Sequence, residues 1–114
     1  MKDDKLYLIH IRECIARIES YVEAGGEGTF MASTLVQDAV LRNLQVMAES
    51  TQRLSDALKS AHPEIDWRQI AGFRNVVVHS YLNVEPDRVW LVIEQDLPSL
   101  KHSVAAMLKE LEDE

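Results

Sequence analysis

The sequence predicts an all-α protein, an up-and-down bundle of about four long helices with one short extra helix. Three observations support this fold class. Apolar residues recur at alternating steps of three and four along three separate segments, which is the spacing of one helix face. Short stretches of turn-forming residues join these segments, and few glycines or prolines interrupt them. No internal repeat or linker divides the 114 residues, so residues 1–114 are expected to form a single domain.

The first predicted helix covers residues 5–24. Its apolar positions form one seam, made up of Leu8, Ile11, Ile15, Ile18 and Val22. Cys14 lies at the edge of this seam, where packing is expected rather than a redox or ligand role. Residues 25–28, Gly-Gly-Glu-Gly, are expected to end the helix and to form a flexible turn.

A second helix is expected somewhere within Phe30–Lys59, because the same apolar spacing continues through this stretch. Asn43 and Glu49 on this helix fit either a buried polar pair or two solvated positions, and we favour solvation. A short loop from Ser60 to Glu64 follows, in which His62 is expected to face water.

A third helix is expected to begin at Trp67. Asp66 can accept a hydrogen bond from the backbone N–H of Gln69, and the Gln69 side chain can reach back, as in a capping box. Residues 76–78, three consecutive valines, favour a strand by propensity, but the capping signals and the helical surroundings favour a helix. Gly72, inside this helix, fits either a close approach of a neighbouring backbone or a tolerated glycine.

The last third of the chain is predicted to contain a turn and two helices. Residues 82–87 include a proline and are expected to form the turn. Residues 88–95 are ambiguous between a buried strand and a short buried helix, and helix is favoured because no second strand is evident for pairing. Asp96 is then expected to cap a last helix, with Pro98 tolerated in its first turn.

The composition is that of an ordinary globular protein, with 46% apolar and 27% charged residues. A single cysteine excludes an internal disulfide and is typical of a reducing compartment, so a cytoplasmic location is expected. The charged start of the chain leads into no sustained apolar run, and the longest apolar run, residues 89–93, is too short to span a bilayer. Neither a signal peptide nor contact with a membrane is therefore expected.

Chemically distinctive residues are concentrated between Arg74 and Tyr81. Arg74 offers a fork of donors suited to phosphate, and His79 can exchange a proton near neutral pH. On a helix, Asn75 and His79 share a face because they are four apart, and Arg74 and Tyr81 lie about 20° from one another. No Asp or Glu occurs from Trp67 through Tyr81. These residues permit phosphate binding combined with proton transfer.

This segment resembles the Arg-x4-His-x-Tyr motif of the HepT-like toxins in the HEPN superfamily. Four residues fall where that family has them, namely Arg74, Asn75, His79 and Tyr81. The resemblance extends to residues 37–44 upstream and 97–100 downstream, and it therefore covers nearly the whole chain. It implies an HEPN-like helical bundle, in agreement with the fold class predicted from the periodicity.

The resemblance further implies a metal-independent endoribonuclease without a cofactor, the toxin of a type VII toxin–antitoxin system. In such an enzyme the ribose 2′-hydroxyl attacks the neighbouring phosphate. His79 would act as general base or acid, Arg74 would stabilise charge on the phosphorane, and Asn75 would position His79 or a phosphate oxygen. Tyr81 would receive AMP from a minimal nucleotidyltransferase, the antitoxin partner. A C2 homodimer with a composite cleft is expected, because two copies would supply two imidazoles.

The formal charge of −7 argues against an RNA-directed role, because nucleic-acid binding usually shows as a basic surface. Much of the acid lies near the chain ends, so the acid-free motif can still form a local positive patch. The alternative is a non-catalytic helical module that binds a nucleotide or a partner protein and is regulated by the same nucleotidyltransferase. A metal site is poorly supported, because the four histidines lie far apart and Cys14 has no neighbour of ligand type.

Overall fold

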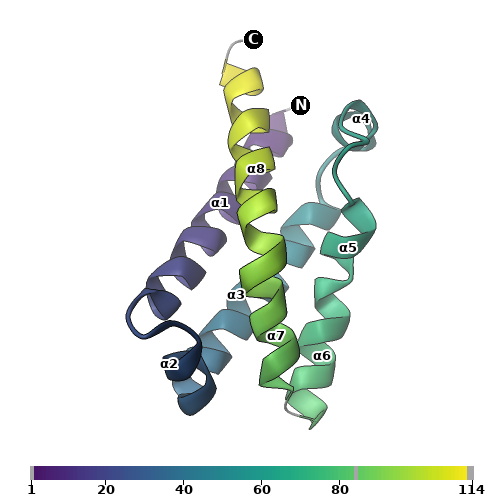
Figure 1. Ribbon diagram of the computed structural model, residues 1–114. Coiled ribbons are helices and arrows are strands. Elements are labelled where there is room, and N and C mark those ends of the chain that lie inside the picture. The colour runs from purple at the N-terminus through teal and green to yellow at the C-terminus, as the bar shows by residue number, and fades with distance from the viewer. Residues whose placement is uncertain (1, 84, 113–114) are drawn as a thin grey trace.

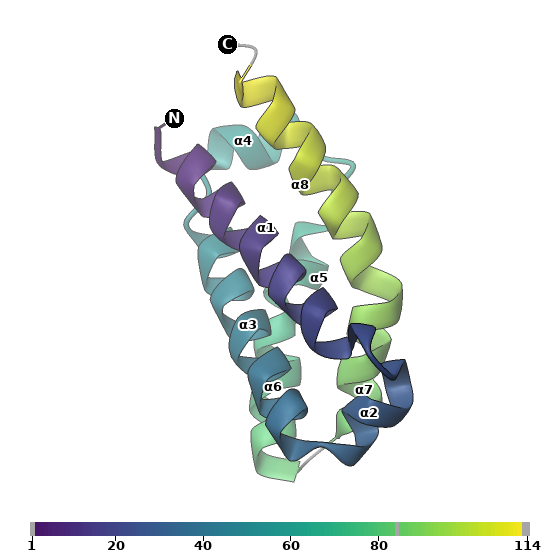
Figure 2. The ribbon, with the colours of Figure 1, turned by 90° about the vertical axis from the view of Figure 1, so that its left-hand side faces the viewer.

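The computed structural model describes residues 2–83 and 85–112, with side chains for residues 3–78 and 85–112. The chain runs up and down through four rods: α1 (Lys2–Glu23), α3 (Thr34–Gln52), α5 (Trp67–Ala71) with α6 (Phe73–Asn83), and α7 (Pro86–Leu91) with η1 (Val92–Asp96) and α8 (Leu97–Glu112). The short helices α2 (Gly26–Ala32) and α4 (Asp56–Ala61) lie at opposite ends of the bundle (Figures 1 and 2). No strand occurs in residues 2–83 and 85–112. The predicted all-α bundle is confirmed.

The core lies where α1 packs against α3 and α8. The predicted seam of α1 is buried along most of its length, and Cys14, at the edge of that seam, is 1% exposed. Burial raises the pKa of the Cys14 thiol, which keeps it protonated and unreactive. The packing role expected for this cysteine is therefore confirmed. The largest fully buried side chains of α3 and α8 are Val40, Leu44, Met47, Val104 and Met107.

The turn at the glycine-rich residues 25–28 is shorter than the sequence suggests. Gly25 has φ 96° and Gly26 has φ 55°, and a side chain at Gly25 would collide with the Thr29 hydroxyl. The chain then enters α2 directly, so Gly28 lies inside a helix and not in a flexible loop. Phe30 of α2 is fully buried, and its ring centroid lies 5.5 Å from that of Trp90 on α7. Helix α2 thus closes one end of the bundle.

The helix predicted somewhere within Phe30–Lys59 is confirmed as α3, but this stretch also contains parts of α2 and α4, because two serines divide it. The Ser33 hydroxyl accepts a hydrogen bond from the N–H of Val36 at 3.1 Å and begins α3. Ser55 begins α4 in the same way. Serine competes with the helix for backbone donors, and apolar periodicity alone does not register such breaks.

Asp4 holds the end of the bundle at which α4 lies. Its Oδ1 accepts from the Ser55 N–H at 2.8 Å, and its Oδ2 accepts from the Ser55 hydroxyl at 2.6 Å. The Asp4 side chain is only 3% exposed. A carboxylate with hydrogen bonds to both oxygens can be buried at tolerable cost. In the sequence, Asp4 is only one of several acidic residues near the chain ends, and nothing there indicates its burial.

Two further side chains are more buried than the sequence indicated. Asn43 is 7% exposed, and its amide donates to the Ala39 carbonyl oxygen at 2.9 Å, whereas Glu49 is exposed as expected. The side chain of His62 is 13% exposed and lies 3.2 Å from a carboxylate oxygen of both Glu64 and Glu110. The expectations that Asn43 is solvated and that His62 faces water are therefore wrong.

The third predicted helix begins at Trp67 but is interrupted. Asp66 accepts from the Gln69 N–H at 3.0 Å, as expected of an N-cap. The Gln69 side chain does not reach back to complete a capping box, because its Nε2 donates to Asp96 Oδ1 at 2.8 Å. At Gly72 the helix gives way to a single turn residue. A Cβ there would lie 3.1 Å from the Gln69 carbonyl oxygen, so the close approach is made by the preceding turn of the same segment.

The last rod, formed by α7, η1 and α8, is one continuous helix and not a short helix followed by a separately capped helix. The helix predicted for residues 88–95 is confirmed against the strand alternative. In η1 the N–H of Leu97 bonds to the Val92 carbonyl oxygen, five residues back. This wider π-turn immediately precedes Pro98, whose ring would clash with the carbonyl four residues before it in a regular helix. Asp96 lies within this continuous helix, so it is not the predicted cap.

None of the helices in the described residues combines the length and the apolarity needed to cross a bilayer.

Candidate active site

Helix α6 carries the Arg74–Tyr81 motif, and its buried face determines where the motif lies. Phe73, Val76 and Val77 are 2%, 8% and 2% exposed and pack toward α3. The β-branched residues are held in the helix by this burial, although their propensity favours a strand. Because these three positions face inward, Arg74 and Asn75 face outward, and both side chains are exposed.

Arg74 lies at the rim of a groove between α3 and α6. The groove has a volume of about 170 Å³ and is lined by Gln45, Glu49, Arg74, Val77 and Val78. Val78 is 53% exposed, so the groove has an apolar side that is open to solvent. Within the described part of the chain, no carboxylate lies within ion-pair distance of the Arg74 guanidinium. Among the described side chains, no carboxylate competes with a ligand for the donors of Arg74.

His79 and Tyr81 lie on α6, but their side chains fall outside the described residues. Their backbone positions support the predicted spacing, because α6 is one uninterrupted helix from Phe73 to Asn83. Asn75 and His79 therefore share one face of α6, and Arg74 and Tyr81 lie about 20° apart around the helix axis. The roles assigned to His79 and Tyr81 stay predictions.

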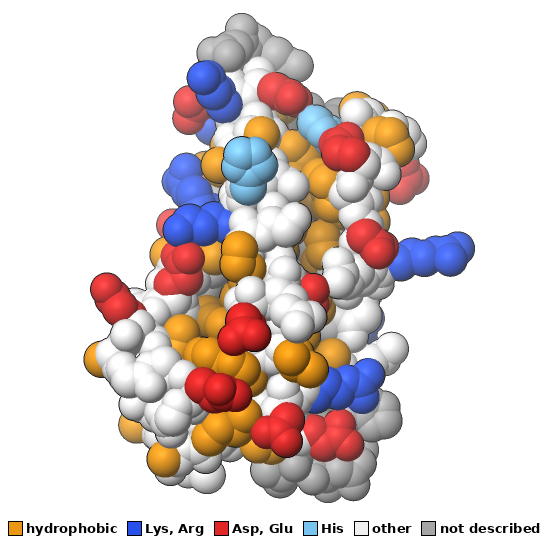
Figure 3. All heavy atoms as spheres, in the orientation of Figure 1, with side chains coloured by type: hydrophobic (Ala, Val, Ile, Leu, Met, Phe, Trp, Pro, Cys, Tyr) orange, Lys and Arg blue, Asp and Glu red, His pale blue; other side chains and the backbone are white. Residues whose placement is uncertain are grey.

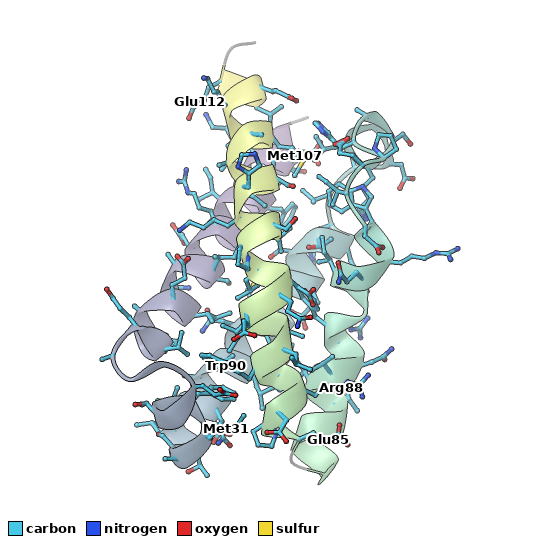
Figure 4. All side chains as sticks on the ribbon, viewed as in Figure 1. Met31, Glu85, Arg88, Trp90, Met107 and Glu112 are labelled. Atoms are coloured by element: carbon cyan, nitrogen blue, oxygen red, sulfur yellow. The ribbon has the colours of Figure 1, made fainter. Side chains whose placement is uncertain are left out.

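The charge around the motif is mixed. No acidic residue occurs from Trp67 through Val84, but Glu49 lines the groove beside Arg74. Arg88, near the junction of α6 and α7, lies 3.7 Å from Glu85 and is partly neutralised by it (Figure 4). The face of the bundle centred on α8 shows interspersed acidic and basic side chains and no continuous basic surface (Figure 3). This face therefore offers no extended basic surface for a phosphate backbone.

A larger cavity, of about 300 Å³, lies between α5 and the rod formed by η1 and α8. Arg74 does not line it, and its polar wall includes the carboxylates of Glu64, Asp66 and Asp96. Burial raises the pKa of Asp96, and the hydrogen bond from Gln69 partly offsets that rise. An acidic wall repels phosphate, so this cavity is a poor candidate for the predicted chemistry.

Sequence reasoning missed Gln45 as a neighbour of Arg74 and treated Glu49 only as a solvated residue. The available signal was their spacing, since residues four apart on one helix share a face. Gln45 Nε2 donates to Glu49 Oε1 at 3.4 Å, so the two side chains form a unit on α3. Which face of α3 meets α6 could not be read from α3 alone.

Comparison with known proteins identifies the family of the chain. The sequence model of the family described as ribonuclease HepT-like matches residues 11–107. A “probable ribonuclease HepT” of Thermococcus cleftensis is 33% identical over 100 residues, which are 88% of this chain and 91% of that protein. The “Gamma-glutamylcyclotransferase and putative RNase MJ0434” of Methanocaldococcus jannaschii is 32% identical over 111 residues. Those residues are 97% of this chain and 50% of that protein, so the chain spans about half its length. No solved structure gives a significant match.

Proposed function

The chain belongs to the family of HepT-like ribonucleases, and from this premise we propose that it is an endoribonuclease toxin that works without a metal ion. The observation that carries the proposal is the placement of Arg74 and Asn75 on the exposed face of α6, in a matching family. Arg74 has no competing carboxylate within ion-pair distance in the described residues. The enzyme would act in the cytoplasm on RNA.

In the proposed reaction the ribose 2′-oxygen attacks the adjacent phosphorus and the bond to the 5′-oxygen breaks. A cyclic 2′,3′-phosphate and a free 5′-hydroxyl result. His79 takes the proton of the 2′-hydroxyl, and a second imidazole gives a proton to the leaving 5′-oxygen. Arg74 stabilises the negative charge on the non-bridging oxygens of the phosphorane. Asn75, four residues before His79 on one helix, is placed to orient the imidazole or a phosphate oxygen.

The need for two imidazoles supports a C2 homodimer. One chain has a single His79, and on a helix Arg74 and His79 diverge by about 140°. Two copies around a twofold axis bring two Arg74 and two His79 side chains to one cleft. The composite cleft is therefore part of the proposal.

A nucleotidyltransferase antitoxin is the proposed regulator. The Tyr81 hydroxyl attacks the α-phosphate of ATP, pyrophosphate leaves, and AMP stays on the phenol oxygen. The added phosphate is negative and lies on the same helix face as Arg74. It would compete with RNA phosphate for that guanidinium and block the cleft.

Cleavage of RNA by purified protein in a metal chelator, without the antitoxin, tests the proposal. Arg74→Ala and His79→Ala are each expected to lower the cleavage rate by at least about 10²-fold, the usual loss when a transition-state charge contact is removed. Arg12→Ala removes an exposed arginine on α1 and is the matched control with unchanged activity. Circular dichroism should show full helix content in all three variants.

Two observations favour a second candidate function. The net charge of −7 and the mixed face in Figure 3 suit a non-catalytic module that binds a nucleotide or a partner protein. Such a module would leave RNA intact in the chelator experiment but would still be modified on Tyr81. Mass spectrometry of Tyr81→Phe co-expressed with the nucleotidyltransferase distinguishes the acceptor. An AMP adduct that persists in this variant would mean that another residue is the acceptor.

A further inference from the structure

The groove between α3 and α6 contains more than the phosphate-binding arginine. Besides Arg74 it has two apolar side chains, Val77 and Val78, and two polar ones, Gln45 and Glu49. Its volume of about 170 Å³ is below the roughly 300–1,000 Å³ of sites for drug-sized ligands. The groove is therefore suited to one small planar group and not to a whole nucleotide.

The polar wall of the groove presents hydrogen-bond acceptors. An ionised carboxylate only accepts hydrogen bonds, and Gln45 already directs its Nε2 toward Glu49 Oε1 at 3.4 Å. The second carboxylate oxygen of Glu49 and the amide oxygen of Gln45 have no hydrogen-bond donor in the described residues. A ligand that fits this wall must bring donors, and two neighbouring donors fit it best.

Among the four RNA bases, guanine meets this requirement. Its Watson–Crick edge carries two adjacent donors, N1–H and the N2 amino group, which match a pair of acceptors. Adenine and cytosine each place a ring acceptor beside their amino group, and uracil flanks its single N–H with two carbonyl oxygens. Those acceptors would face the Glu49 carboxylate and be repelled. Single-stranded RNA exposes such edges, so the edge is available in a substrate.

The apolar side chains and Arg74 complete the fit. Val78 is 53% exposed and offers a surface against which the face of a base can lie. Arg74 lines the same groove, so a base in the groove would bring its own or an adjacent phosphate near the guanidinium. Glu49 alone would weaken phosphate binding by charge repulsion. A guanine that satisfies the carboxylate offsets this effect, and a poorly matched base does not.

We propose that the groove between α3 and α6 is a nucleobase subsite in which Glu49 and Gln45 select guanine at a nucleotide next to the phosphate held by Arg74. This inference rests on the proposed ribonuclease function and names the substrate preference of that centre. It assigns to Glu49 a specificity role and not a role in the chemical step.

Binding of uncleavable RNA tests the subsite separately from catalysis. The probes are short 2′-O-methyl oligonucleotides, which lack the attacking hydroxyl, with a single guanosine or none in an otherwise uridine sequence. Fluorescence polarisation with the full-length protein should show roughly ten- to a hundredfold tighter binding of the guanosine probe, the usual worth of a bidentate base contact. Glu49→Gln should reduce this ratio to within about threefold and leave uridine binding equal or tighter, because it removes a negative charge.

Two controls make the result specific. Glu27→Gln on α2 removes an equivalent exposed carboxylate that lines none of the described grooves, and it should keep the full guanosine preference. Val78→Ala should weaken all probes by a similar factor, since it removes contact with the base face and not with its edge. A structural defect would not change the ratio between two probes.

Three outcomes would overturn the subsite. They are equal binding of both probes by the unaltered protein, an unchanged ratio in Glu49→Gln, and an equal loss for both probes in that variant. An equal loss for both probes in Glu49→Gln would mean that Glu49 supports the fold or the chemistry. Equal binding of both probes by the unaltered protein would mean that the groove binds a lysine or arginine of a protein partner and not a base. Failure of the proposed function is a different result: no RNA is cleaved in chelator, whatever the binding ratio.

Discussion

Two parts of the bundle differ in how many of their side chains are buried and how many are exposed to solvent. In the block formed by α1, α3 and α8, the contact faces are apolar along most of their length, and many side chains are fully buried. Among its described side chains, the α5–α6 rod buries Ile70, Phe73, Val76 and Val77, and it is interrupted at Gly72. The block therefore supplies most of the stability, and this allows α6 to keep Arg74 and Asn75 in solvent. Changes in the two parts should separate stability from activity.

The largest effect on stability is expected at Leu44 in the block. Leu44→Ala removes a side chain that is 0% exposed, and the free energy of unfolding should fall by about 2–5 kcal/mol because a cavity forms. Leu35→Ala makes the same change on the same helix at a position that is 79% exposed. It should change the free energy of unfolding by less than about 0.5 kcal/mol. Urea denaturation followed by circular dichroism measures both, and similar losses would mean that the block does not dominate stability.

An intermediate effect is expected at Asp4, which links the start of α1 to α4. Asp4→Ala removes two charge-assisted hydrogen bonds to Ser55, and the free energy of unfolding should fall by about 1.5–3 kcal/mol. Asp3→Ala removes a neighbouring exposed carboxylate from the same first turn and so controls for the helix dipole. If both variants lose equal stability in urea denaturation, the dipole and not the Ser55 contact explains the effect.

The spacing of apolar residues predicted the helices of the block well, because burial of their apolar faces holds the block together. The seam predicted for residues 5–24 is the one that packs in the core, because apolar residues spaced three and four apart lie on one face of a helix and are buried together. The interruptions were harder to predict. Single hydrogen bonds and local steric contacts cause the interruptions at Ser33, at Gly72 and at the π-turn before Pro98. The spacing of apolar residues does not show such local interactions.

The candidate site was predictable in part for a related reason. The motif on α6 is local in sequence, so its helical spacing could be predicted and is consistent with the observed helix. The groove is not local, because Gln45 and Glu49 come from α3, about thirty residues earlier in the chain. Likewise, Gln69 was read as half of a capping box, but a partner 27 residues away, Asp96, takes its side chain. Tertiary contacts override local signals wherever a polar side chain has two possible partners.

The smallest expected effect concerns Asp96 on η1, whose carboxylate accepts a hydrogen bond from Gln69 of the α5–α6 rod. Burial raises the pKa of Asp96 in the folded protein. The folded state therefore holds the Asp96 proton to higher pH than the unfolded chain, in which an aspartate titrates near about 3.9. This carboxyl's contribution to stability is fully present below that value and is lost as pH rises through the folded pKa. The hydrogen bond from Gln69 opposes this loss but is the smaller of the two effects.

Asp96→Asn removes the titrating group and keeps an oxygen that can accept from Gln69. Relative to the unaltered protein, the variant should gain up to about 0.5 kcal/mol as pH rises from the ordinary aspartate range toward neutrality. Urea denaturation at several pH values measures this difference, and other carboxylates cancel because both proteins contain them. Glu94→Gln, an exposed change on the same π-turn, is the matched control. A difference for Asp96→Asn that falls with rising pH would show that the charged hydrogen bond from Gln69 outweighs burial. In that case the hydrogen bond from Gln69 to Asp96 would contribute more to the stability of the α5–α6 rod than the burial of its apolar residues suggests.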